Sequence, residues 1–405
     1  MSILQKQKQA DAALGYARDF PPLVARIGRA VRERGVKVIA NAGGVNPVAC
    51  AREVLRLAPG LKVAVVLGDD VFGRIDEFLA KGYEMRDMDT GQPLETIRER
   101  ILSANAYIGA FPLAEALATG ADVVVAGRST DTALTLAPMI QRFGWKADEY
   151  DKLAAGTIAG HIIECGAQCS GGNCQVDWQS IPDMANIGYP IVEAEPDGTF
   201  CVTRHPAAGG RVSSDTVKEQ LLYELGDPQN YITPDCVADF TSIRLEDAGP
   251  DRVRVRGIRG GPRPASLKLS IAYANGWKAI GTLVYSWPQA LEKARAADGI
   301  VRERVRRLGL AFEEIYTEFL GVNACHGPAA SPNPDPPEVQ LRIGVRGADR
   351  KAVDRFTREL IPLVLNGPPG ATGFGEGRPT VREIVAYWSA LVPREEISTR
   401  VEVVA

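Results

Sequence analysis

Apolar segments of strand length in the first third of the chain each run directly into a glycine-containing polar turn. They span residues 36–40, 62–67 and 122–126, and segments with helical periodicity lie between them. The turns that follow them span residues 41–47, 68–70 and 127–131. Alternation of strands with helices is typical of a parallel sheet covered by helices. Because ligands bind at the carboxyl ends of such strands, we expect these turns to form the functional site.

The second half of the chain has a different periodicity. Runs with alternating apolar and polar residues, joined by short glycine-containing links, indicate antiparallel strands over residues 252–258, 267–273 and 279–286. Further strands are expected over 312–320, 339–345 and 400–404, helices over 288–308 and 350–364, and loops over 327–337 and 367–379. The second loop is dense in glycine, so we expect it to be a mobile flap.

The predicted fold class is therefore α/β. We expect an N-terminal parallel sheet with helices on both faces, followed by an α+β part with a mostly antiparallel sheet. The predicted domains are 1–190, an α/β domain with glycine-rich ligand-binding turns, and 191–405, an α+β domain.

Composition excludes several classes of function. The 405 residues include 47 Lys and Arg against 50 Asp and Glu, a net charge of −3, which argues against a nucleic-acid partner. No run of about 18 apolar residues indicates a membrane span, and the N-terminus lacks a signal-peptide pattern. The seven cysteines, an odd number without paired spacing, favour free thiols. We therefore expect a cytoplasmic protein without a membrane partner.

The first turn, residues 41–47, is a candidate anion site. Gly43 and Gly44 allow close backbone approach, and Pro47 suits the first turn of a helix. Free N–H groups and a helix N-terminus would attract an anion. We expect Asn41, Gly43, Gly44 and Asn46 to bind substrate, although a plain strand-to-helix turn explains them equally well. The turn is neither a P-loop nor a dinucleotide fingerprint, so the sequence identifies no cofactor.

The turn after the strand at 122–126 is a second candidate. Arg128 offers a planar fork for a carboxylate or phosphate, while Ser129, Thr130 and Asp131 can cap the following helix. Capping alone would account for the last three residues, so Arg128 gives the stronger indication of ligand contact.

The third candidate begins on a helix, where His161 and Glu164 are three residues apart and share a face. A histidine and a carboxylate at this spacing can act as acid and base, or as two ligands of a metal. A buried helix with a hydrogen-bonded histidine is the alternative. The spacing of the nearby cysteines does not match a zinc pattern, so we predict no metal site. Gly171 and Gly172 form a further turn that exposes backbone to a substrate.

A fourth glycine-rich segment, 205–210, precedes Ser213 and another helical period. It could also hold an anion, but an ordinary N-cap at Ser213 is the preferred interpretation.

These segments resemble a known family. The motifs ANAGGVNP, AGRSTDTAL, GHIIECGAQ with the following SGG, TVKEQLLYE and LGVN are similar to those of the acyclic terpene utilisation (AtuA) family, over roughly residues 1–391. The resemblance implies a part in the bacterial breakdown of acyclic terpenoids such as citronellol and geraniol, or of related branched acids, whose intermediates are coenzyme A thioesters. It implies no particular reaction.

The chain departs from the family pattern in two places. Family members usually have a further strand and glycine-rich turn upstream, so we expect a central strand and part of the pocket to be absent from this chain. Cys169 and Cys174 occupy positions where other residues are expected.

Two functions are compatible with these features. The first is an enzyme that acts on a branched acyl thioester by hydration, dehydration or hydrolysis, with His161, Glu164 and Asp131 as catalytic groups. The second is a non-catalytic acyl-coenzyme A binding or assembly subunit of the pathway. In either case the expected partners are a small-molecule substrate and a second copy of the chain, since symmetric dimers are the commonest assemblies.

Overall fold

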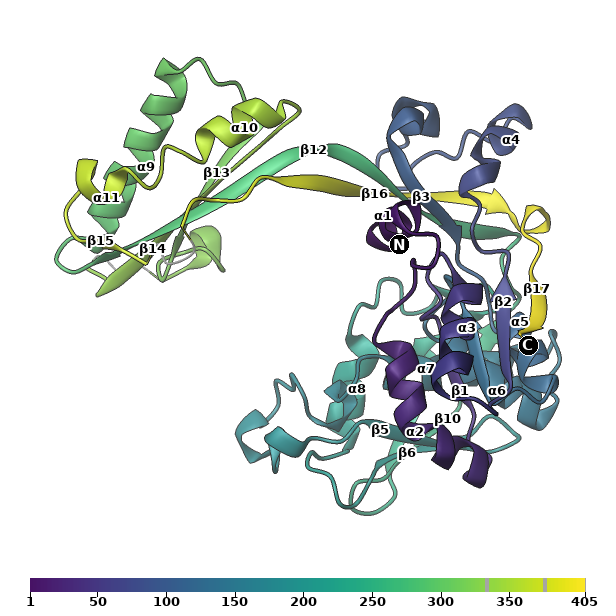
Figure 1. The fold of residues 1–405 in the computed structure, drawn as a ribbon. Coiled ribbons are helices and arrows are strands. Elements are labelled where there is room, and N and C mark those ends of the chain that lie inside the picture. Colours follow the sequence, from purple (N-terminus) through teal and green to yellow (C-terminus); the bar gives the residue numbers. More distant parts are fainter. Residues whose placement is uncertain (332–334, 374–376, 405) are drawn as a thin grey trace. The chain divides into compact units, whose positions relative to one another are not determined.

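The computed structural model describes residues 1–331, 335–373 and 377–404 (Figure 1). The chain forms two compact units: Met1–Ala272 together with Trp388–Ala405, and Tyr273–Tyr387. These units differ from the predicted domains 1–190 and 191–405. The reason is that strands after residue 190 share a hydrophobic core with the helices before it, as Phe200 and Val253 do with Leu153.

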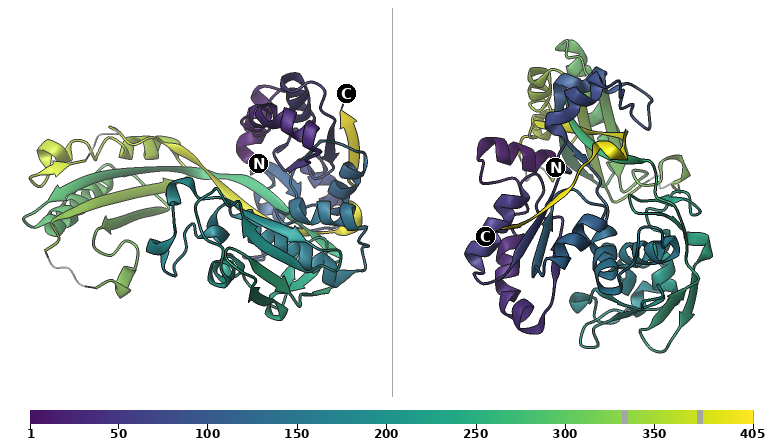
Figure 2. Two further views of the ribbon diagram at one scale, coloured as in Figure 1. Left: turned by 90° about the horizontal axis from the view of Figure 1, so that it is seen from below. Right: turned by 90° about the vertical axis from the view of Figure 1, so that its right-hand side faces the viewer.

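The first unit contains the predicted parallel sheet. Strands β1 (Val38–Ala40), β4 (Val123–Ala126) and β2 (Val63–Leu67) are adjacent and parallel. The predicted C-terminal strand, β17 (Arg400–Val404), is present and is the yellow strand that ends at C in Figure 2. It pairs antiparallel with β2. The mixed α/β class is confirmed.

Helices cover both faces of this sheet because its strands are apolar on both sides. One set of side chains, including Val63 and Val123, packs with α2 (Phe20–Arg34) and α3 (Pro47–Leu57). The alternate set, including Val66 and Val124, packs with α5 (Phe111–Ala118), α6 (Ala133–Phe143) and α7 (Tyr150–Glu164).

Shorter elements complete the first unit. They include α1 (Ser2–Ala10), α4 (Ile75–Ala80), β3 (Ile101–Ala106) and α8 (Ser214–Leu222). One antiparallel sheet has the strand order β5 (Pro190–Ala194), β6 (Phe200–Arg204), β10 (Val253–Arg256) and β9 (Arg244–Asp247). Another has the order β11 (Arg259–Gly261), β8 (Val237–Asp239) and β7 (Tyr231–Ile232). At the start of α8, Ser213 forms a capping box with Thr216, which confirms the N-cap interpretation.

The second unit is an antiparallel sheet with helices. Its strands are β13 (Glu314–Leu320), β14 (Glu338–Gly347), β12 (Ser266–Ser286) and β15 (Ala371–Thr372), and β16 (Arg382–Pro393) also pairs with β12. The first residues of β12 and the last residues of β16 belong to the first unit. Its helices are α9 (Ala290–Arg307), α10 (Arg350–Phe356) and α11 (Leu363–Asn366).

Two predicted elements differ from those observed in the second half. The strands expected over 267–273 and 279–286 are one continuous strand, β12, because Gly276 adopts a φ of +83° within the strand instead of forming a turn. The helix expected over 350–364 is divided into α10 and α11, since Pro362 disfavours helical backbone in the residue before it.

Parts of both predicted loops lie outside the described residues. In the loop at 367–379, the described part includes β15, which pairs with β12, and residues 374–376 are not described. In the loop at 327–337, a short 3-10 helix spans Gly327–Ala329, and residues 332–334 are not described. The flap remains a prediction.

Candidate functional site

The polar turns after β1 and β4 meet the end of helix α7 at one cavity. The Nδ2 atom of Asn41 donates a hydrogen bond to Oδ1 of Asp131 at 3.2 Å. Nη2 of Arg128 lies 3.9 Å from Oδ2 of Asp131. The cavity has a volume of about 420 Å³ and is lined by Asn41, Asp131, Leu134, Thr135, Gly160, Ile163 and Glu164. The structure therefore brings Asn41, Asp131 and Glu164 together.

A glycine in α7 makes this arrangement sterically feasible. A Cβ atom at Gly160 would lie 2.7 Å from both Cα and the carbonyl oxygen of Thr132, closer than real Cβ contacts. Without a side chain there, α7 packs directly on the residue that follows Asp131. Glu164, one helical turn beyond Gly160, then reaches the same cavity.

The environment of Glu164 favours its protonated form. Burial raises the pKa of this carboxyl above its ordinary value, and the nearby charges of Asp131 and Glu224 raise it further, whereas Arg128 opposes the shift. A carboxyl group that keeps its proton to a higher pH is suited to donating one to a substrate. Asp131, held by Asn41 and close to Arg128, is the second acid of the cavity.

Tyr231, whose phenol senses the charges of this acidic pair, does not act as an acid at neutral pH. Burial raises the pKa of Tyr231 to about 12, and the charges of Glu164 and Asp131 act in the same direction. Its phenol is therefore neutral at physiological pH.

The structure does not place His161 in the cavity. The side chain is 2% exposed, and its Nε2 atom lies 3.0 Å from the carbonyl oxygen of Gln220. Its ring packs edge-on against Tyr231 and Phe240, with centroids 5.5 and 5.3 Å away. Burial lowers its pKa, so the neutral imidazole is favoured. These are the features of the buried, hydrogen-bonded alternative.

The glycine-rich turn after β1 does not offer the free N–H groups that we expected. The amides of Gly43, Gly44, Val45 and Asn46 donate to the carbonyl oxygens of Ala126, Asn41, Gly15 and Gly43. The Asn46 side chain also donates to the carbonyl oxygens of Ala12 and Leu14, at 2.9 and 2.7 Å. These amides are therefore not free to bind an anion as expected: those of Gly43 and Val45 bond to residues distant in sequence, and the other two bond within the turn. Asn41 is the residue of this turn that lines the cavity.

Arg128, Ser129 and Thr130 each bring an unsatisfied polar atom to the same edge of the sheet. The Arg128 guanidinium lies 4.4 Å above the centre of the Tyr107 ring. Arg128 Nε, Ser129 Oγ and Thr130 Oγ1 are buried without a hydrogen-bond partner within the described ranges. Buried polar atoms normally have partners, so these three are candidates to meet water or the polar part of a substrate.

A comparison with family models identifies the chain. The model described as "Acyclic terpene utilisation family protein AtuA" matches residues 1–403. The chain belongs to the AtuA family. This confirms the resemblance noted from the motifs, and family membership implies a role in acyclic terpene utilisation. The comparison with curated proteins finds no match.

The AtuA-family structure also contains a buried acid in the predicted turn 68–70 that was not among the named candidate residues. Asp69 follows β2 and is 3% exposed; burial raises its pKa to about 6. It accepts hydrogen bonds from the Arg128 backbone N–H at 2.6 Å and from Asn105 Nδ2 at 3.0 Å. A Cβ at Gly127 would lie 2.3 Å from Asp69 Oδ1. Asp69 therefore positions the turn that carries Arg128, and an acid directly after a buried strand was its sequence signal.

The remaining predicted residues of this AtuA-family chain lie apart from the cavity lining. Gly171 has a φ of +101° and packs against Ile181, while the Gly172 amide donates to the carbonyl oxygen of Ala167. Burial raises the pKa of the Cys169 thiol to about 12, which makes it a poor nucleophile at neutral pH.

The described residues contain neither a cluster of metal ligands nor a helix of membrane-spanning length and apolarity. Within these residues, no group of at least three His, Cys, Asp or Glu side chains is arranged to hold a metal ion. No helix in the same part of the chain is long and apolar enough to span a membrane.

Proposed function

We propose that this protein catalyses an acid/base step of acyclic terpenoid breakdown on a branched acyl group carried as a coenzyme A-type thioester. The step would be a hydration, a dehydration or a hydrolysis. The observation that supports this proposal is the pair of carboxyl groups, Asp131 and Glu164, in one cavity in which burial and the neighbouring charges raise the pKa of Glu164.

The two acids are suited to complementary tasks. Asp131 accepts a hydrogen bond from Asn41 and lies near the Arg128 cation, which holds its carboxyl group in the cavity where it could take a proton from water. Glu164 donates its proton to the substrate, and Asp131 takes a proton from water. Proton exchange with solvent then returns both carboxyl groups to their starting states. Leu134 and Ile163 give the cavity an apolar wall for the hydrocarbon chain.

The turn after β4 would receive the polar end of the acyl group. Arg128 Nε, Ser129 Oγ and Thr130 Oγ1 are buried without a partner among the described residues, and the Arg128 cation suits a carbonyl or carboxylate oxygen.

Turnover of defined thioesters tests this function. The full chain is incubated with geranyl-type and citronellyl-type coenzyme A thioesters, and their consumption is followed by mass spectrometry. We expect Glu164→Gln to slow consumption by about 10²–10⁴-fold while thioester binding is retained. Glu115→Gln, a change on the exposed side of α5, is the matched control and should behave as the parent.

The pH dependence of this activity provides a sharper result. If Glu164 donates a proton, kcat/KM falls as pH rises through its raised pKa, and this limb of the profile is absent from the residual activity of Glu164→Gln. A parent protein that binds these thioesters but consumes none under any tested condition contradicts the catalytic proposal. That result favours the non-catalytic acyl-coenzyme A binding subunit.

A further inference from the structure

One face of the sheet in the second unit carries large exposed apolar side chains. Alternate side chains of β14, such as Leu341 and Ile343, pack in a hydrophobic core with residues of α9 and α10, and Figure 1 shows these helices on one side of the sheet. The other face includes Tyr316, which is 59% exposed, and Ile280, which is 51% exposed. Large apolar side chains therefore point away from the core of this unit.

The strand register orders this face into rows. Tyr316 of β13 pairs with Gly344 of β14, which pairs with Ile280 of β12, so these three form an apolar row. The row on one side consists of Glu314, Arg346 and Lys278, and the row on the other side consists of Glu318, Arg342 and Thr282.

The central glycine makes the apolar row concave. Gly344 has no side chain, so a shallow groove of about 300 Å³ lies on this face, with Tyr316 and Ile280 in its lining. Contiguous exposed apolar surface bordered by charges is typical of a protein interface. The groove is open enough to receive a side chain from a second sheet.

The charges on this face are incompletely paired within the unit. Arg342 forms an ion pair with Glu318, and Arg346 Nη2 lies 3.1 Å from Glu313 Oε2. Lys278 and Glu314 have no ion-pair partner among the described residues, and both are exposed. They lie in the same row, on either side of Arg346.

We propose that this face binds the same face of a second copy of the chain, related by a two-fold axis that runs along β14. Such an axis places Glu314 opposite the partner's Lys278, and Lys278 opposite the partner's Glu314. It also places Tyr316 opposite the partner's Ile280. The grooves at Gly344 of the two copies would face each other and leave space for these side chains. Two sheets pack face to face in this way at a spacing of about 10 Å.

The arrangement favours a second copy over an unrelated partner because the unpaired charges are self-complementary. An isologous interface requires each patch to match itself after a rotation of half a turn. Rotation about β14 exchanges the unpaired anion with the unpaired cation. The arginines that it places opposite their own copies, Arg342 and Arg346, are each already paired with a glutamate. Rotation about the apolar row would instead place Glu314 opposite the partner's Glu318. The inference does not depend on the proposed acid/base activity.

Charge reversal in the full chain tests the interface. The parent protein is measured by sedimentation velocity over a dilution series, and we expect a dimer that dissociates on dilution. Lys278→Glu and Glu314→Lys each create like-charge pairs, so each should raise the dimer Kd by roughly tenfold or more. The double variant restores both pairs and should return the Kd close to that of the parent.

Matched controls separate this interface from general surface effects. Lys351→Glu changes an exposed lysine on α10, on the helix-covered side, and should leave the dimer Kd unchanged. Circular dichroism confirms that each variant is folded. A parent that stays monomeric throughout the dilution series overturns the proposal. So does a dimer that tolerates both single reversals, or a double variant that is no tighter than either single variant.

Discussion

Asp69 links the stability of the fold to the position of the candidate site. Its buried carboxyl has a pKa of about 6, against an ordinary value of 3.8. Between these two values the folded chain holds a proton that the unfolded chain has released, so the free energy of unfolding falls as pH rises through this window. Asp69→Asn removes this group, and we expect it to flatten that part of the pH dependence.

Urea denaturation at a series of pH values measures this effect. The Asn side chain also weakens the acceptor for the Arg128 amide, so the variant should lose about 1–3 kcal/mol near its stability optimum. Asp89→Asn, at an exposed position, is the control and should keep the parent slope. An unchanged slope in Asp69→Asn would show that Asp69 is ionised in the folded protein throughout the window.

Sequence reasoning at the residue scale succeeded where a residue follows a strand and failed where long-range packing decides. Asn41 and Asp131 could be expected together because parallel strands end at one edge, whereas Glu164 reaches them from α7 through the close packing of Gly160 on Thr132. The spacing of His161 from Glu164 gives only a shared helix face. What His161 contacts depends on Gln220 and on aromatic rings distant in sequence, and no local pattern encodes these contacts.

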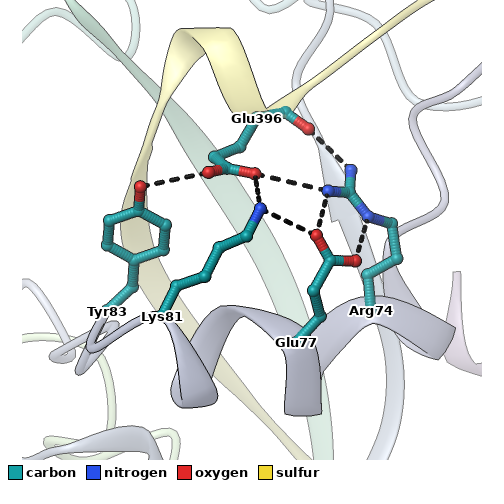
Figure 3. A network of polar contacts seen from close by, with 5 residues as sticks. All are labelled: Arg74, Glu77, Lys81, Tyr83 and Glu396. Carbon is teal, nitrogen blue, oxygen red and sulfur yellow. Dashed lines mark hydrogen bonds and ion pairs between the residues drawn. The ribbon is translucent and has the colours of Figure 1, made fainter.

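At the scale of elements, a polar network attaches the C-terminal segment to α4 (Figure 3). Lys81 Nζ donates to Glu396 Oε2 at 2.6 Å, and Tyr83 Oη donates to Oε1 at 3.1 Å. Arg74 donates to the backbone carbonyl of Glu396 at 2.6 Å and also pairs with Glu77. The network therefore holds the turn that precedes β17 at the edge of the parallel sheet.

Removing the Glu396 charge should loosen β17. We expect Glu396→Gln to speed hydrogen exchange of the amides in Arg400–Val404 and to lower the melting temperature. The hydrogen bond from Lys81 lowers the pKa of Glu396, and the hydrogen bond from Arg74 lowers that of Glu77 to about 2. Their stabilisation is therefore present above the ordinary carboxyl pKa and is lost as pH falls towards 2.

The neighbouring glutamate is a suitable control for this prediction. Glu395→Gln changes the same 3-10 turn outside the network drawn in Figure 3, and it should leave exchange in β17 at the parent rate. Equal acceleration in both variants would mean that the ion pairs do not hold the strand.

Element types were largely predictable, but their continuity was not. The strand at 400–404 was expected from its apolar alternation, yet its partner β2 is more than 300 residues away in sequence. Gly276 lies in one of the short glycine-containing links that were expected to separate two strands. The pairing of Trp277–Ser286 with β14 instead keeps the chain extended on the C-terminal side of this glycine.

At the scale of the whole molecule, the chain contains separate hydrophobic cores. The core of the second unit is built from β12, β14, α9 and α10, and the large core of the first unit shares no residue with it. This division could not be predicted from the order of the sequence because the C-terminal residues, from Trp388 onwards, belong to the first unit. Separate cores predict that the two units can lose structure independently.

A cavity in the smaller core tests this independence. Phe356 of α10 is fully buried and contacts Phe312 edge-on at 6.1 Å, so Phe356→Ala should cost the second unit about 3–5 kcal/mol. We expect hydrogen exchange in moderate urea to become faster in β13 and β14, while β2 and β4 keep their parent protection. Leu136→Ala, in the core of the first unit, should produce the reverse pattern. If Phe356→Ala instead accelerates exchange equally in β2 and β14, the two cores unfold as one cooperative unit, because the strands β12 and β16 that run from one unit into the other transmit the loss.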